Sequence, residues 1–237
     1  MTATRQETKT NLSHAEMRIK VSKNGPYLVT GGIPLTEQTL IPDADGYSVG
    51  YRESKKYPAQ ENYDLCRCGH SSDKPFCDMT HLDIGFDGTE TASREPYLNQ
   101  AKERTVGPEL ELTDAQALCA SARFCDRAGG VWDNTRQSDD PEAKRIAIEE
   151  VGFCPAGRLV IWNKEGNAIE PEFEPSIALI QDPVAGVIGP IWVRGGIPVE
   201  ADDGTIYEIR NRVTLCRCGK SSHKPFCDGC HVDARPQ

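Results

Sequence analysis

The chain has 237 residues, of which 38% are hydrophobic and 27% are charged, and its formal net charge is −9 at pH 7. This negative balance argues against general nucleic-acid binding, which needs basic surfaces that displace phosphate counterions. No apolar run is long enough to span a membrane, and the first residues lack the apolar core of a secretory signal, so we expect a cytoplasmic protein without a membrane segment. Ten cysteines in such a chain indicate metal or redox chemistry rather than disulfides.

Two blocks of sequence occur twice, in the same order. GPYLVTGGIPL at 25–35 returns as GPIWVRGGIPV at 189–199, and LCRCGHSSDKPFCDMTH at 65–81 returns as LCRCGKSSHKPFCDGCH at 215–231. The first copy carries about fourteen extra residues between its blocks, within a polar stretch. We therefore predict a duplicated module with a loop insertion in the first copy.

Each module is predicted to be rich in short strands. A Gly-Pro turn precedes an apolar stretch at 27–29 or 191–193, and a Gly-Gly break separates it from an alternating segment that leads into Leu-Cys-Arg-Cys. Between the modules we predict helices at 113–128 and 139–151, the second with an aspartate cap and a proline in its first turn. Residues 173–183 are expected to form a connector into the second module.

The second block contains the spacing Cys-x-Cys-x8-Cys-x3-His in both copies. Residues i and i+2 of an extended segment point to the same side, so the Cys-x-Cys pair can present two thiolates to one metal. An aspartate after the third cysteine can begin a helical turn, which brings the histidine four positions on toward that cysteine. The spacing thus predicts two ligand pairs in each copy. The candidate ligands are Cys66, Cys68, Cys77 and His81 in the first copy and Cys216, Cys218, Cys227 and His231 in the second.

Two pairs of ligands suit a [2Fe–2S] cluster, with one iron on the Cys-x-Cys pair and the other on cysteine and histidine. A neutral imidazole in place of a thiolate should raise the potential above that of an all-cysteine site. A structural zinc site with three cysteines and one histidine uses the same ligand types and remains the alternative. The spacing favours iron and sulfide, because zinc knuckles usually place two to four residues between paired cysteines.

The motif resembles the CDGSH iron–sulfur domain, the family that includes the mitochondrial NEET proteins. The resemblance covers residues 17–81 and 186–231 and rests on Cys-x-Cys, the Lys-Pro-Phe loop and the Cys-Asp-x-x-His ending. It implies two redox-active, acid-labile [2Fe–2S] clusters at the eight candidate ligands. Two departures leave the ligands intact. Met79 stands where the family has glycine. Cys230 stands in for serine, and we interpret it as an inert replacement, with a reactive thiol that competes for iron as the alternative.

Three further cysteines lie in the middle of the chain, at Cys119, Cys125 and Cys154. This segment resembles the divergent mono-cluster ferredoxin-like domain, with Ala122 where a bacterial ferredoxin has its second cysteine. The resemblance implies a [3Fe–4S] cluster, or a [4Fe–4S] cluster with an outside ligand. The alternative is that these cysteines are small buried residues in a degenerate domain kept for packing.

The expected fold class is α+β, with two small β-rich CDGSH-type modules at 17–92 and 184–237 and a small α+β ferredoxin-like segment at 93–183. The expected function is electron transfer or iron–sulfur cluster transfer, with a redox or iron sensor, or an accessory subunit of an oxidoreductase, as alternatives. We expect no enzyme activity of the chain alone, because no nucleotide-binding or nucleophile motif is found. A redox partner protein or an apo-protein acceptor is the expected partner. We expect a monomer with an internal pseudo-twofold pair, with a homodimer as the alternative.

Overall fold

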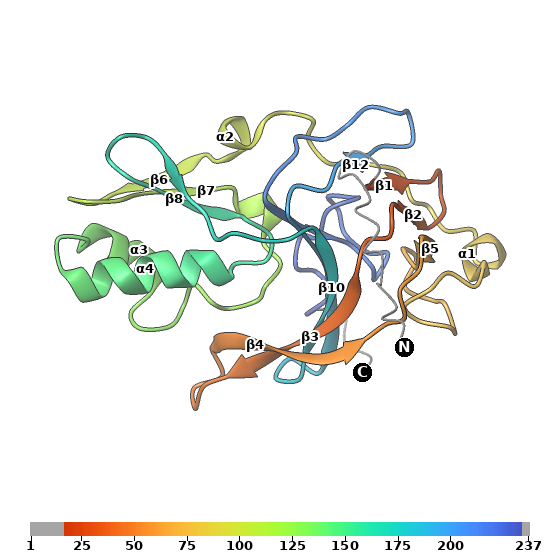
Figure 1. Ribbon diagram of the computed structural model, residues 1–237, viewed down its shortest axis with the longest axis horizontal. Helices are drawn as coiled ribbons and strands as arrows, with labels where there is room; N and C mark the ends of the chain where they lie inside the picture. The colour runs from red at the N-terminus through yellow and green to blue at the C-terminus, as the bar shows by residue number, and fades with distance from the viewer. Residues whose placement is uncertain (1–16, 234–237) are drawn as a thin grey trace, which may run out of the picture.

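The computed structural model describes residues 17–233 and contains three β-sheets and a few short helices (Figure 1). The α+β fold class is confirmed. The first module contributes the strands β1 (Arg18–Val21), β2 (Tyr27–Thr30), β3 (Leu35–Pro42), β4 (Ser48–Lys56) and β5 (Asn62–Leu65). The second module has β11 (Val187–Arg194), β12 (Val199–Glu200) and β13 (Arg212–Leu215), preceded by β10 (Ser176–Asp182).

The two modules exchange strands. One sheet has the order β12-β1-β2-β5 and the other has the order β13-β11-β10-β3-β4. The short strand β12 pairs in parallel with β1, with Ile19 opposite Val199, and β3 pairs in parallel with β10, with Leu35 opposite Ile177. Each module therefore places the strand after its Gly-Gly break in the sheet of the other module. This is the arrangement of an internal pseudo-twofold pair within one chain.

A single hydrophobic core lies between these two sheets and takes residues from both modules. It includes Ile19, Val29 and Leu65 from the first module and Ile191 and Leu215 from the second, each at most 1% exposed. Successive residues of a strand point to opposite faces, and both sheets place one apolar face against this shared core. The second sheet also buries part of its other face, where Ala178, Ile180 and Trp192 pack with Phe124. The division into modules at 17–92 and 184–237 stays a prediction, since the core and the sheets run across it.

Two segments have more regular structure than the sequence indicated. Residues 173–183, expected to connect into the second module, contain β10, which leads into β11 and lies between β11 and β3 in the second sheet. The polar insertion of the first copy is largely β4, which pairs with β3 as a long hairpin at the sheet edge. Its outer residues are exposed, which explains why a hydrophobic alternation did not indicate a strand there.

The middle segment forms its own sheet, with the order β6-β7-β8-β9. Its strands are β6 (Glu103–Val106), β7 (Glu111–Asp114), β8 (Leu159–Trp162) and β9 (Ala168–Ile169). The helices α3 (Val131–Arg136) and α4 (Pro141–Phe153) cover one face of this sheet, at one end of the molecule in Figure 1. The remaining short helical elements are α1 (Thr80–Asp83), α2 (Tyr97–Gln100) and a 3₁₀ turn at Gln116–Leu118.

One helix of the middle segment was predicted correctly and the other was not. The helix expected at 139–151 is α4, capped by Asp140, whose carboxylate accepts from the backbone N–H groups of Glu142 and Ala143 at 2.7 and 3.0 Å. The helix expected at 113–128 does not form. Its first residues complete β7, and the rest is a winding loop in which Ser121 and Arg123 have left-handed backbone angles. None of the helices in residues 17–233 has the length and apolar character that crossing a membrane requires.

Candidate functional site

The two Cys-x-Cys pairs are spaced as ligands of one tetrahedral metal. The Sγ atoms of Cys66 and Cys68 are 3.7 Å apart, and those of Cys216 and Cys218 are 3.6 Å apart. Two sulfurs bound at about 2.3 Å to one tetrahedral metal are about 3.8 Å apart. The loop after β5 or β13 thus holds both thiols at the separation that metal binding needs.

The second ligand pair of each site is also formed. Sγ of Cys77 lies 3.3 Å from Nδ1 of His81, and Sγ of Cys227 lies 3.4 Å from Nδ1 of His231. The short helix α1 and the corresponding turn in the second copy bring the histidine over the cysteine four residues earlier. Both imidazoles are buried, with 7% and 6% of their surface exposed. The Nδ1 atom is therefore the nitrogen that faces the metal position.

The same hydrogen bonds hold the cysteine loop in both copies. In the first, Asp78 accepts from the hydroxyl and backbone N–H of Ser72 at 2.6 and 2.8 Å, and Ser71 donates to the carbonyl of Phe76 at 2.7 Å. The second copy repeats these bonds through Asp228, Ser222 and Ser221. These bonds lower the pKa of Asp78, so this carboxylate stays charged and the loop stays closed over a wide pH range.

Four of the six candidate cysteines are buried, namely Cys66, Cys68, Cys216 and Cys227. Burial raises the pKa of Cys227 and of Cys68, so a nearby cation is needed to make these thiols ionise. Within residues 17–233, no three histidine, cysteine, aspartate or glutamate side chains converge on one point that could hold a single metal ion. Each site is instead two separate pairs. That arrangement fits a two-metal cluster better than the four-ligand zinc site considered from the sequence.

The middle cysteines gather at one cavity. Cys119, Cys125 and Cys154 line a space of about 220 Å³ together with Ala122, the residue at the missing cysteine position. The backbone N–H of Ser121 points to Sγ of Cys119 at 3.4 Å. Left-handed backbone angles at Ser121 and at Arg123 give the loop its winding course, a conformation that non-glycine residues adopt at some cost and often at functional sites. The structure thus brings these three predicted residues together.

The walls of the two repeated sites touch. A Cβ atom placed on Gly69 would lie 2.6 Å from the carbonyl oxygen of Cys218, and one on Gly219 would lie 2.4 Å from that of Cys68. Only glycine permits this approach, because both residues also have left-handed angles. The loop that follows Cys68 therefore rests on the loop that carries Cys218, and the reverse contact is made as well.

The middle cavity adjoins the second repeated site. A Cβ atom on Gly229 would lie 2.3 Å from Oγ of Ser121 and 3.0 Å from the carbonyl oxygen of Cys119. On the other side, Cys227 packs against Ala120 and Ala156 with Cys154 beside them. The second repeated site thus lies between the first repeated site and the middle cavity.

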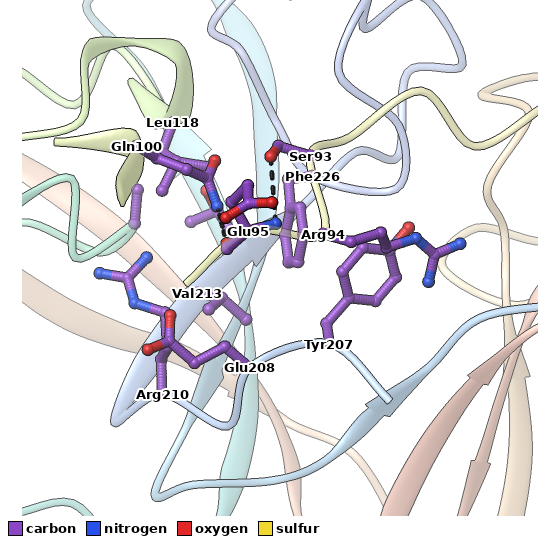
Figure 2. Close-up of a pocket in the computed structure, with 12 residues that line it drawn as sticks. Ser93, Arg94, Glu95, Gln100, Leu118, Tyr207, Glu208, Arg210, Val213 and Phe226 are labelled. Carbon is purple, nitrogen blue, oxygen red and sulfur yellow. Dashed lines mark hydrogen bonds between the residues drawn. The ribbon is translucent and has the colours of Figure 1, made fainter. Parts of the chain in front are cut away.

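A smaller cavity is lined in part by Phe226, the residue before Cys227 (Figure 2). Its volume is about 20 Å³, which holds little more than one water molecule. Figure 2 shows Glu95 joined by hydrogen bonds to Ser93 and Gln100, and Arg94 reaching past Tyr207. This cavity is a packing gap between the middle segment and the second module, without room for a ligand.

Comparison with known protein families decides the assignment. The model of the iron-binding zinc finger of CDGSH type matches residues 24–82 and 188–232. Both ends of the chain carry a CDGSH-type iron-binding domain. The model of the divergent 4Fe-4S mono-cluster matches residues 105–164, between the two CDGSH domains. Searches of curated proteins and of solved structures found no match. The families identify an iron–sulfur protein, with CDGSH domains at both ends and a ferredoxin-like domain between them.

Sequence analysis did not single out the arginines inside the Cys-Arg-Cys motifs. Arg67 is 2% exposed and donates to the carbonyl oxygens of Ser22 and Gly88. Arg217 donates to the carbonyls of Gly189 and Ile180 at 2.5 and 2.7 Å, and burial lowers its pKa to about 10. Each motif thus carries, between its first two cysteines in sequence, a buried arginine that backbone carbonyls hold. The sequence did contain a signal for these residues, because an arginine recurs between the first two cysteines of both motifs.

Proposed function

We propose that the protein transfers electrons through a [2Fe–2S] cluster at each CDGSH site and a third cluster in the middle cavity. Each CDGSH cluster is held by three thiolates and one Nδ1 nitrogen, and the third cluster is held by three thiolates. The proposed ligands are Cys66, Cys68, Cys77 and His81, then Cys216, Cys218, Cys227 and His231, and for the third cluster Cys119, Cys125 and Cys154.

The contact between the three sites is the observation that carries this proposal. Gly69 and Gly219 bring the two CDGSH loops into backbone contact, and Gly229 brings the second CDGSH loop against the middle cysteine loop. Electron tunnelling weakens steeply with distance, so centres with shared walls are suited to passing electrons. A protein with a purely structural role for its metal sites has no need to place them next to each other.

The protein's own groups tune these sites for taking up an electron. An iron–sulfur cluster, when bound, accepts and releases one electron. Backbone N–H groups of Met79, His70 and Gly229 point to the candidate thiolate sulfurs at 3.4 Å each. These donors, the buried Arg67 and Arg217, and a neutral histidine ligand all favour the reduced, more negative state. We therefore expect potentials above those of all-cysteine sites.

Burial of the ligands favours electron transfer over release of the cluster to another protein. Both histidine ligands have at most 7% of their surface exposed, and Cys227 is 3% exposed. A cluster that leaves must first exchange a ligand, and an acceptor cannot reach buried ligands without opening the loop. We propose that the clusters stay bound while electrons pass.

The test uses the purified, cluster-loaded protein with two acceptors. After reduction, cytochrome c should be reduced with one electron per reduced cluster while the visible absorbance of the clusters returns to its oxidised level. An apo-ferredoxin incubated with the same protein should stay apo. Loss of cluster absorbance with a matching gain on the apo-ferredoxin, and no reduction of cytochrome c, would replace electron transfer with cluster delivery.

A further inference from the structure

A second, larger cavity lies outside the cluster sites. It measures about 440 Å³ and lies between α4 and the sheet that contains β3, β4 and β11. Its walls carry four aromatic rings, a guanidinium group and a glycine, from Tyr51, Phe153, Phe173, Trp192, Arg194 and Gly152. Its size is within the range of small-molecule sites. We propose that this cavity binds a planar aromatic molecule that carries a negative charge.

The aromatic walls suit a flat ligand. Trp192 stacks on Tyr51, with ring centroids 4.6 Å apart and an interplanar angle of 29°, and meets Phe173 edge to face at 5.5 Å. Phe153 closes another side, and its position is fixed because Tyr51 donates a hydrogen bond to its carbonyl oxygen at 2.8 Å. Rings held in this way prefer to stack with another ring, which an aliphatic ligand of the same size does not offer.

Arg194 gives the cavity its charge. Its guanidinium lies 4.7 Å from the ring centre of Trp192 and 5.9 Å from that of Phe173. No carboxylate of residues 17–233 forms a salt bridge with it, and its Nε atom is buried without a hydrogen-bond partner. Glu53 attracts it only at longer range. Desolvation without a partner lowers the pKa of Arg194, and an anionic ligand would supply the missing charge.

The two carboxylates at the cavity are already paired, so they do not cancel Arg194. Glu149 accepts from Arg127 at 2.8 Å and from Arg145 at 2.6 Å. Glu170 pairs with the buried Arg212 and accepts from Asn211 at 3.0 Å. With both acids neutralised by their own arginines, the field inside the cavity stays positive. This sign selects an anionic ring over a neutral or cationic one.

Two stacked phenylalanine rings separate this cavity from the cavity of the middle cysteines. Phe153 lines it and stacks on Phe124 at a centroid distance of 5.3 Å, and Phe124 lines the cavity of Cys119, Cys125 and Cys154. A bound aromatic anion would therefore be a neighbour of the proposed third cluster. Binding of the ligand does not require that cluster. The ligand site therefore goes beyond the proposed function, and each of the two proposals can be refuted without the other.

The experiment measures binding of 2-naphthoate and of its neutral analogue 2-naphthamide to the purified full-length protein by isothermal titration calorimetry. We expect 2-naphthoate to bind about tenfold or more tightly than 2-naphthamide. Arg194→Gln should remove this preference, and Arg194→Lys should keep part of it. Arg52→Gln makes the same change of charge at an exposed position of β4 and should leave binding unchanged.

A second variant fills the cavity without touching the charge. Gly152 is in α4, and a Cβ atom placed on it would meet nothing within 4 Å apart from the backbone of its own helix and its chain neighbours. Gly152→Leu should fold, because leucine favours helix more than glycine does, and should abolish binding of both probes. Gly152→Ala should weaken binding little. Equal affinity for both probes, or unchanged binding of 2-naphthoate in Arg194→Gln and Gly152→Leu, would overturn the proposal, as would a wild-type protein that binds neither probe.

Discussion

Replacing Gly219 by alanine tests how closely the two CDGSH sites are packed. Gly219 has φ of +77°, where an L-residue is strained by about 1–2 kcal/mol. Its new Cβ would also lie 2.4 Å from the carbonyl oxygen of Cys68, far inside van der Waals contact. Because the atom it meets is backbone, the two loops must separate, and overpacking of this kind adds about 1–3 kcal/mol. We expect the free energy of unfolding to fall by about 2–5 kcal/mol in total.

Denaturant unfolding of cluster-loaded protein measures this loss, and Gly204→Ala is the matched control. Gly204 has a similar φ of +85°, but nothing lies within 4 Å of a Cβ placed there, so it should lose only the backbone part. The visible circular dichroism should also change at the first site, since Cys68 is its ligand although the substitution is in the second repeat. Equal losses for both variants, with unchanged cluster spectra, would show that the two loops are not in close contact.

Three further predictions concern single residues. Met79 has φ of +70°, so Met79→Gly should raise the free energy of unfolding by about 0.5–1 kcal/mol. Thr80→Gly changes a residue of α1 and should lower the free energy of unfolding. Equal effects of the two substitutions in denaturant unfolding would contradict this prediction. Burial raises the pKa of Glu150 from 4.5 to about 7, so the folded state holds a proton that the unfolded state loses, and stability falls as pH rises from 4.5 through 7. Glu150→Gln should therefore add up to about 3 kcal/mol at pH 8 and nothing at pH 4, and a pH-independent difference in unfolding free energy would refute it. Protonation of a histidine ligand competes with the metal, so His81→Cys or His231→Cys should slow acid bleaching of that site and lower its reduction potential. Stopped-flow absorbance measures the bleaching rate and a redox titration measures the potential. Unchanged bleaching rates would exclude the histidine as the labile ligand.

The ligand pairs of the CDGSH sites could be predicted from sequence because each is set by local spacing. Cys66 and Cys68 are two residues apart, and Cys77 and His81 are four apart across the turn that leads into α1, so no distant contact is needed to bring each pair together. Helix α4 was predictable for the same reason, through its own cap at Asp140. These features depend on neighbours in the chain.

The remaining features depend on partners far away in the sequence. The duplication indicated an internal pair, but nothing local in β12 shows that it pairs with β1 rather than with its own module. The segment 113–128 contains residues that favour helix. Its residues 119–126 nevertheless line the middle cavity, and Ser121 lies against Gly229, so this part of the chain forms a winding loop. The aromatic cavity beside Arg194 likewise exists only because α4 packs near the second sheet.

Quantification of iron, zinc and acid-labile sulfide in anaerobically purified protein, together with its electron paramagnetic resonance spectrum, tests the central claim most directly. Two [2Fe–2S] clusters and one three-thiolate [3Fe–4S] cluster predict about seven irons and about eight sulfides, with an oxidised [3Fe–4S] signal. About four of each, with a [2Fe–2S] spectrum alone, would remove the third cluster and keep the two CDGSH sites. About two zinc ions without sulfide, in protein that never lost a cluster, would contradict the account.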